Sequence, residues 1–232
     1  MEIADMLRRN AEIYNDDRYF AEDPIIFPKK FASLFRTGSS CFQDVEIAAV
    51  MASHLAWGRR SMIIRDCRKA FDEMQWKPYD YVMKGNYRND TASLHRTVKW
   101  NEFASICSRL KAFYNENNTL EVLSPEQMRT GIFGSKSNPN AANKKIHMMR
   151  RWMVRDDGKV DLGLWKNTDK AGLIIPLDVH VHNTSIKLGI TQRKSPDFRT
   201  ASEITGYLAG VFPGDPVKGD FALFAVAASG NC

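Results

Sequence analysis

Apolar residues recur along this chain mostly at the spacing of a helix. Residues 45–55 (VEIAAVMASHL) show the clearest such pattern, with Asp44 as a natural N-cap and Gly58 as the end. Further helices are predicted over 61–74, where a serine provides the cap, over 101–115 and over 143–154. The period-two alternation typical of half-buried strands is nearly absent. The pattern therefore predicts a mainly α-helical protein.

The stretch LIIPLDVHVHNTSIKLG, residues 173–189, places polar residues inside an apolar run. Pro176 predicts an extended entry into a helix, with Asp178 at or near its N-cap. Such a cap stabilises a helix by about 1 kcal/mol, so the aspartate has a simple structural explanation. The buried side of this helix is predicted to carry Val181, Ile186 and Leu188.

The segment GDPVKGDFALFAVAASG predicts a last helix. Asp215 is its predicted N-cap and Pro216 takes the first helical position. A packing face is expected from Phe221, Phe224 and Val226, and two tryptophans elsewhere, Trp152 and Trp165, are expected in the core. Residues 130–143 (TGIFGSKSNPNAAN) are rich in Gly, Ser, Asn and Pro and predict a loop.

A chain of 232 residues can form one large domain or two small lobes. No stretch approaches the roughly 20 apolar residues that a membrane span requires. The first residues, MEIADMLRRN, are too polar for a secretory signal. We therefore expect a cytoplasmic protein without a membrane partner.

The pattern of metal-binding residue types indicates no cofactor. No C-x-x-C pair occurs among the four cysteines, which argues against a zinc site, an iron–sulfur cluster or a disulfide framework. His180 and His182 lack companion ligands at a useful spacing. The cysteines are Cys41, Cys67, Cys107 and Cys232.

The formal net charge is +6, and the basic residues gather in two segments, 58–71 (GRRSMIIRDCRKAF) and 143–155 (NKKIHMMRRWMVR). On helices, each segment would present a positive stripe beside an apolar one, as expected of a protein that binds a phosphate backbone. Two solvated helix faces would explain the same composition. The charge suggests nucleic acid and leaves both interpretations open.

The residues around Asp178 resemble a known catalytic motif. L-D-V-H-V-H, followed by a basic and apolar helix, is similar to the V-D-x-H-x-x-R segment of the helix-hairpin-helix DNA glycosylases. This HhH-GPD superfamily includes endonuclease III and the oxoguanine glycosylases. The resemblance implies that Asp178 is the catalytic aspartate, facing the cleft from a helix N-terminus, and that His180 matches the superfamily's histidine.

A closer resemblance spans nearly the whole chain, which is identified as a member of an uncharacterised bacterial family affiliated with that superfamily. The matching blocks are DPIIFPKKF, DVEIAAVMASHLAWGRRSMI, PYDYVMKG, KKIHMMRRWMVR, VDLGLWKNTDKAGLIIPLDVHV and DPVKGDFALF. The resemblance implies a two-lobed helical DNA-glycosylase-like fold with a central cleft. Residues 42–172 would form a helical bundle lobe with an altered hairpin, and 1–41 with 173–232 the second lobe.

Glycosylase chemistry needs a carboxylate, and lyase activity also needs a neutral amine. Breaking an N-glycosidic bond builds positive charge on the sugar, which a nearby carboxylate stabilises. A lysine that attacks the anomeric carbon forms a Schiff base, and this leads to strand cleavage. The L-P-G-V-G-x-K hairpin that carries this lysine in the superfamily is absent here, so the nucleophile has to be sought elsewhere.

Lys144 is the main candidate, because it follows the Gly/Ser/Asn loop and its spacing from Asp178 is similar to that in archaeal oxoguanine glycosylases. A lysine in the first helical turn opposes the helix dipole, which favours the neutral amine. Lys145 is adjacent and remains an alternative, as does a solvated basic pair. Lys159 lies in the acidic turn RDDGK and is better explained as a surface lysine.

The resemblance also implies positions that contact DNA. In the altered hairpin these are Gly134, Ser135 and Lys136, together with Lys145 and His180. Trp57 would act as the wedge that fills the gap left by an extruded base, with Arg59 and Arg60 on phosphates. Phe224 would stack on the damaged base, although core packing would also explain it.

Together these features predict a DNA-repair glycosylase, with AP-lyase activity, that excises a flipped damaged base from double-stranded DNA. An oxidised purine such as 8-oxoguanine is the expected base. The alternative is a non-catalytic helical DNA-binding protein on the same scaffold, which the missing hairpin sequence favours. No obligate protein partner is implied.

Overall fold

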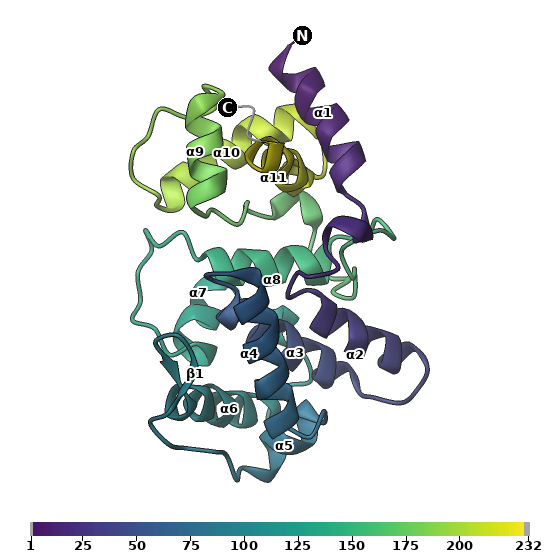
Figure 1. Ribbon diagram of the computed structural model, residues 1–232, viewed down its shortest axis with the longest axis vertical. Helices are drawn as coiled ribbons and strands as arrows, with labels where there is room; N and C mark the ends of the chain where they lie inside the picture. Colours follow the sequence, from purple (N-terminus) through teal and green to yellow (C-terminus); the bar gives the residue numbers. More distant parts are fainter. Residues whose placement is uncertain (1, 230–232) are drawn as a thin grey trace. The chain divides into compact units, whose positions relative to one another are not determined.

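The computed structural model describes residues 2–229, with side chains up to Val226, and is mainly α-helical as predicted (Figure 1). The chain forms two compact units. We call Phe20–Ser137 the middle unit, and Met1–Tyr19 with Asn138–Cys232 the end-containing unit. No helix among the described residues is long and apolar enough to cross a membrane.

The middle unit contains six helices of the α type and a small hairpin. Its elements are α2 (Ile26–Arg36), α3 (Phe42–Leu55), α4 (Arg60–Glu73), α5 (Pro78–Lys84), β1 (Ser93–His95), β2 (Val98–Lys99), α6 (Trp100–Tyr114), the 3₁₀ turn η2 (Leu120–Val122), α7 (Pro125–Gln127) and the π turn η3 (Met128–Ile132). Within residues 2–229, β1 and β2 are the only strands.

Helix α3 runs through the core of the middle unit, since nearly all of its residues are buried. It begins three residues earlier than predicted, and Asp44 is not its N-cap. Cys41 takes that position, and the Asp44 carboxylate accepts a hydrogen bond from the Cys41 backbone N–H at 3.0 Å. Its other oxygen accepts from the Tyr79 N–H at 2.8 Å, which ties α5 to α3. Asp44 does take part in capping the helix, as predicted, but from the third helical position and not from the N-cap.

The turn between α3 and α4 contains Gly58, whose φ of +100° favours glycine. Helix α4 then begins at Arg60 with Arg59 as its N-cap, so the predicted serine cap is wrong. The Ile63 N–H bonds to the Arg59 carbonyl oxygen at 3.0 Å, so Ser61 lies inside the first turn of the helix and not before it.

The end-containing unit brings the first helix of the chain to the last. Its elements are α1 (Ile3–Tyr14), α8 (Lys144–Val154), α9 (Val179–Lys187), α10 (Phe198–Val211) and α11 (Gly219–Ser229), with the 3₁₀ turns η1 (Asp17–Tyr19), η4 (Lys170–Gly172) and η5 (Pro216–Lys218). Helices α1 and α11 pack along one another, and α9 packs on α11 (Figure 1).

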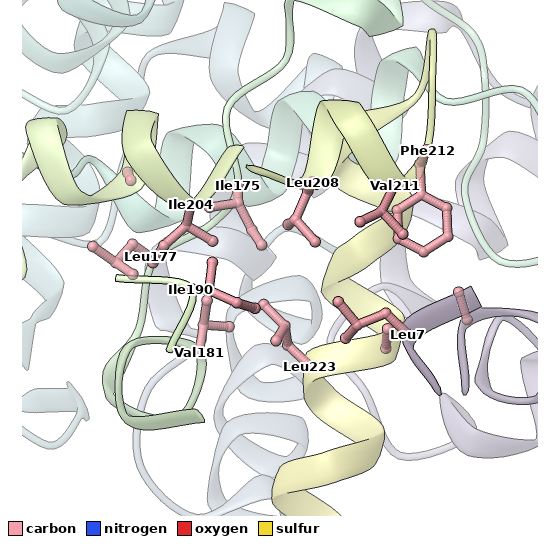
Figure 2. Packing of buried hydrophobic residues seen from close by; sticks show 13 residues of the cluster. Leu7, Ile175, Leu177, Val181, Ile190, Ile204, Leu208, Val211, Phe212 and Leu223 are labelled. Carbon is pink, nitrogen blue, oxygen red and sulfur yellow. The ribbon is translucent and has the colours of Figure 1, made fainter. Parts of the chain in front are cut away.

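Apolar side chains from α1, α9, α10 and α11 form one cluster with the extended segment before α9 (Figure 2). Leu7 of α1 meets Leu223 of α11 there, and Ile175 and Leu177 enter from the extended segment. Val181 is buried as predicted, whereas Ile186 is 38 % exposed, so its predicted place on the buried side is wrong. Leu188, directly after the end of α9 at Lys187, is half-buried and packs against the cluster as predicted.

The segment 215–226 follows the predicted pattern in part. Pro216 is the first residue of η5 and α11 follows directly, but the Asp215 side chain makes no cap hydrogen bond and accepts from Arg155 instead. Phe221 and Val226 are buried and Phe224 is half-buried. Trp152 and Trp165 are buried, which confirms their predicted place in the core.

The two units divide the chain after Tyr19 and after Ser137, whereas the family resemblance implied divisions after residues 41 and 172. Residues 20–41 lie in the middle unit because α2 packs on α3. Residues 138–172 lie in the end-containing unit, where Arg151 of α8 forms an ion pair with Asp220 of α11. Tertiary packing and long-range ion pairs set these boundaries.

Candidate active-site residues and nucleic-acid interface

Asp178 is the N-cap of α9, as predicted, and its Oδ1 accepts a hydrogen bond from the Val181 N–H at 2.9 Å. The segment before it is buried and is anchored by the Ile175 N–H, which donates to the Thr205 hydroxyl at 3.1 Å. Asp178 itself is half-buried, and Val179 beside it is 68 % exposed. The buried extended segment before α9 thus places the Asp178 carboxylate at the N-terminus of the helix, near the surface.

Lys144 is the first residue of α8, and Asn143 before it has the positive φ of +47°. The N–H groups of Ile146 and His147 bond to the Asn143 carbonyl oxygen at 2.9 and 3.0 Å, which closes the first turn. Lys144 and Lys145 are both half-buried. Lys144 precedes Arg151 by two helical turns, so these two residues lie on the same side of α8.

A network of buried charges lies behind α8. Arg151 pairs with Asp220 and, at 3.3 Å, with Asp161, while Arg155 pairs with Asp161 at 2.5 Å and with Asp215 at 2.8 Å. The side chains of both arginines are at most 6 % exposed. Each buried charge has an opposite partner with direct hydrogen bonds, as low-dielectric surroundings require.

This network approaches Asp178 through Asp220. Burial, together with the negative charge of Asp178, raises the pKa of Asp220 to about 6 against the opposing effect of Arg151. Because the charge of Asp178 raises the pKa of Asp220, the two carboxylates lie near one another. Helix α8 is therefore connected through Arg151 and Asp220 to α11, and α11 packs on α9.

Other predicted residues lie in the same unit. His180 is exposed, in the first turn of α9. The Phe224 ring meets Tyr14 of α1 edge-on, with ring centroids 6.4 Å apart. Lys159 is exposed and its Nζ lies 3.5 Å from Glu12, in keeping with the surface turn expected for it. Gly158 in that turn has a φ of +68°.

The loop predicted as an altered hairpin follows the π turn η3. Gly134 has a φ of +63°, and a Cβ there would clash with the Arg109 guanidinium, so only glycine allows this approach. The Ser135 N–H donates to the Arg129 carbonyl oxygen at 2.9 Å, and is therefore not available to a phosphate. Arg129 also donates to the carbonyl oxygen of Lys136 at 2.8 Å. The loop is shaped by arginine contacts within the middle unit.

Trp57 is 38 % exposed in the turn between α3 and α4. The Arg96 guanidinium carbon lies 4.6 Å from its ring centroid, and the His95 ring meets it edge-on at 5.4 Å. Arg59 and Arg60, which follow Gly58, are exposed. The tryptophan is thus an accessible side chain held by two residues of the β1–β2 hairpin.

Sequence reasoning missed the buried pair that fixes this hairpin. His95 Nδ1 lies 2.8 Å from Asp66 Oδ2, and His95 Nε2 lies 2.9 Å from the Trp57 carbonyl oxygen. Both partners are acceptors, so the two hydrogen bonds form together only when both ring nitrogens carry a proton. The available signal was Asp66 itself, a lone carboxylate within the basic segment 58–71.

The charge of the Asp66 carboxylate helps to hold the hairpin in place. Burial alone would raise its pKa, but hydrogen bonds from Arg65 and His95 outweigh this effect and lower the pKa. Arg65 binds both carboxylate oxygens, at 2.7 and 3.1 Å. The ionised form of Asp66 is therefore the one that holds the hairpin on α4.

The predicted residues fall into two sets, one in each unit. The end-containing unit carries Lys144, Lys145, Asp178, His180 and Phe224. The middle unit carries Trp57, Arg59, Arg60, Gly134, Ser135 and Lys136. Within residues 2–229, no group of three or more His, Cys, Asp or Glu side chains is arranged to hold a metal ion.

Comparison with known proteins identifies a family. The family described as "Protein of unknown function (DUF2400)" matches residues 23–132 and 124–229, which is most of the chain. No curated protein and no solved structure matches the chain.

Proposed function

Because this chain belongs to the DUF2400 family, whose description gives no activity, we propose a function from its own residues: it is a DNA glycosylase with AP-lyase activity. The proposal includes the helix-hairpin-helix glycosylase fold. Its substrate is double-stranded DNA with an oxidised purine, for which 8-oxoguanine is the first base to test.

The observation that supports the proposal is the placement of Asp178 and Lys144. Both belong to the end-containing unit, and each stands at the start of a helix. The Arg151–Asp220 ion pair joins the helix of Lys144 to α11, on which the helix of Asp178 packs, and the charge of Asp178 raises the pKa of Asp220. A carboxylate at the surface and an amine on a linked helix are the two groups that this chemistry needs.

The proposed roles are as follows. The neutral amine of Lys144 attacks the anomeric carbon of the nucleotide, and the glycosidic bond breaks with its electron pair leaving on the base, which takes up a proton. The Asp178 carboxylate stabilises the positive charge that develops on the sugar. Loss of a proton from nitrogen and opening of the sugar ring give the Schiff base, from which elimination of the 3′ phosphate cleaves the strand.

The remaining predicted residues would bind the DNA around this reaction. Trp57 would fill the space of the extruded base, and its exposed ring suits that role. Arg59, Arg60 and Lys136 would bind phosphates. Flipping a base costs a few kcal/mol of lost stacking and pairing, which these contacts and the stacking of Phe224 would offset.

A non-catalytic DNA-binding protein is the second candidate. The hydrogen bond from the Val181 N–H explains the Asp178 carboxylate as a helix cap without any chemistry. Such a protein would release no base and cleave no strand. Replacing Asp178 would then change helix stability and leave DNA binding unchanged.

Borohydride trapping on duplex oligonucleotides separates these candidates. The oligonucleotides carry 8-oxoguanine, uracil or an abasic site, and undamaged duplex is the reference. We expect a covalent adduct on a lesion-containing duplex, because borohydride reduces the Schiff base. Lys144→Ala should abolish it, whereas Lys145→Ala, which removes the adjacent amine, should retain it.

One result would change the assigned nucleophile, and another would contradict the proposed function. An adduct that persists in Lys144→Ala and disappears in Lys145→Ala would assign the nucleophile to the neighbouring lysine. No adduct and no base release on any lesion, with DNA binding intact, would leave the non-catalytic DNA-binding protein.

A further inference from the structure

A groove of about 680 Å³ lies on the middle unit, between α4 and the β1–β2 hairpin. These two elements pack side by side (Figure 1). The groove is lined by four basic side chains, Arg65, Arg68, Lys69 and Arg96, and by two acidic ones, Asp66 and Asp72. None of these residues belongs to the catalytic pair proposed above.

Helix α4 presents its cations on one face. Arg65, Arg68 and Lys69 are spaced as i, i+3 and i+4, so their side chains project in nearly the same direction. All three residues are exposed. The Lys69 Nζ donates to the Ser93 carbonyl oxygen at 3.1 Å, which joins the helix to strand β1 across the groove.

The hairpin supplies the fourth cation from the opposite side. Arg96 lies in the turn between the two strands with a φ of +52°, an unusual conformation for a residue with a side chain. Its guanidinium stacks over the exposed ring of Trp57. A base or sugar that leaves the groove at this end would therefore meet a cation and an aromatic face together.

The two acidic residues do not cancel this charge at the surface. The Asp66 side chain is only 3 % exposed, and Arg65 and His95 occupy it from either side. Asp72 is exposed and keeps its charge, because its hydrogen bond comes from the neutral Trp76 indole at 2.8 Å, so three cations remain against one carboxylate. Arg68, Lys69 and Arg96 thus face solvent on a rigid support, and the potential they create is positive.

We propose that this groove binds consecutive phosphates of one DNA strand and guides that strand past Trp57. The choice of DNA rests on the proposed function. Exposed cations spread along an open groove suit a repeating phosphate backbone, whereas a small phosphate compound would need buried donors converging on one point. The groove extends the DNA contact beyond Arg59 and Arg60 along the length of α4.

The test is the salt dependence of binding to an undamaged DNA duplex, measured by fluorescence anisotropy with the full chain. The variant combines Arg68→Gln, Lys69→Gln and Arg96→Gln. Each lost phosphate contact should reduce the slope of log K against log salt by about 0.9. Between about 50 and 200 mM NaCl, the unmodified protein should lose about 40-fold more affinity than the triple variant.

A matched control removes the same charge from the same unit. It combines Arg36→Gln, Lys77→Gln and Lys84→Gln, three exposed residues that do not line the groove. This control should retain the slope of the unmodified protein. Equal slopes for the groove variant and the control would overturn the proposal, as would a larger effect of the groove variant on RNA duplex than on DNA.

This experiment is independent of catalysis because no lesion is present. A reduced slope together with no trapped adduct on any lesion would retain the groove and remove the glycosylase activity. Lesion-dependent trapping together with an unchanged slope would retain the glycosylase activity and remove the groove as a DNA-binding site. If the unmodified protein bound no DNA at all, both proposals would be wrong.

Discussion

Asp161 in the end-containing unit and Asp66 in the middle unit are both buried and both bind arginine, yet their pKa values shift in opposite directions. Burial raises the pKa of Asp161 despite the charges of Arg151 and Arg155. The pKa of Asp66 is lowered because hydrogen bonds from Arg65 and His95 outweigh burial. The Arg65 side chain is 67 % exposed, whereas that of Arg155 is 1 % exposed.

The difference in arginine exposure indicates that ion pairs have a different role in each unit. In the end-containing unit the arginines are buried with their acids, so they hold α8, α11 and the turn at Asp215 together. Burial alone would lower the pKa of Arg155, but the hydrogen bond with Asp215 and the charges of Asp161 and Asp157 outweigh it and raise the pKa. In the middle unit the acid is buried and the cations remain at the surface, where a ligand can reach them.

The strongest test of this contrast is Arg155→Ala. The change leaves Asp215 and Asp157 without their arginine and Asp161 with only Arg151, inside the protein. Removing one partner of a buried ion pair costs about 3 to 5 kcal/mol. Urea denaturation should show a loss of unfolding free energy in this range, and a loss below about 1 kcal/mol would show that the network contributes little to stability.

The second test concerns His147, which is buried in α8 beside Phe198. Burial, together with the charge of Arg150, lowers its pKa to about 4. The unfolded chain takes up this proton near pH 6.5 and the folded chain only near pH 4, so folding becomes less favourable as pH falls between these values. The loss at pH 4.5 should be about 2 to 3 kcal/mol.

His147→Leu removes this titration and is the matched comparison. The difference in unfolding free energy between the variant and the unmodified protein should shift in favour of the variant as pH falls from 7 to 4.5. A difference that does not depend on pH would contradict the assignment of His147 as a buried neutral side chain.

A smaller effect is expected at Asp178. Asp178→Ala removes the hydrogen bond to the Val181 N–H and should cost about 1 kcal/mol of unfolding free energy. Asp178→Asn retains a capping side chain, so it should retain stability while it loses base release if the carboxylate is catalytic. Loss of stability in Asp178→Asn as large as in Asp178→Ala would contradict this separation.

Asp197 provides the matched control for that experiment. It caps α10 in the same unit by accepting a hydrogen bond from the Thr200 N–H at 2.9 Å, and no role in chemistry is proposed for it. Asp197→Asn should leave base release unchanged. A parallel loss of activity in both asparagine variants would mean that the effect at Asp178 is structural.

The smallest effect is expected from Arg65→Gln. Arg65 is largely exposed, and His95 continues to bind Asp66 after the change. Exposed ion pairs contribute little to stability. Thermal denaturation should therefore show no measurable shift of the midpoint, and a clear shift would mean that Arg65 resembles the buried arginines of the other unit.

The sequence predicted the elements whose signals are local. The helical spacing and caps located α6 and α8 to within about one residue of each end, and Pro176 placed Asp178 correctly at the start of α9. These features depend on neighbouring residues only, so a single sequence carries them.

Features that depend on distant residues were not predictable in the same way. Strands β1 and β2 have three and two residues, too few for a period-two pattern, and Arg96 rather than glycine takes the positive φ in their turn. The sequence showed that segment 58–71 is basic, but it did not show which side of α4 faces the hairpin. Neither of the ion pairs of Arg151 and Arg155 with the last part of the chain has a local signal.

The packing of α1 on α11 has a consequence for how the protein is made. The middle unit is one continuous stretch of chain, so it can fold on the ribosome before translation is complete. The end-containing unit cannot, because its packed helices α1 and α11 are synthesised before and after the middle unit. Until α11 is made, Leu7 lacks the apolar cluster that buries it in the folded protein, so this face of α1 is exposed to aggregation during synthesis.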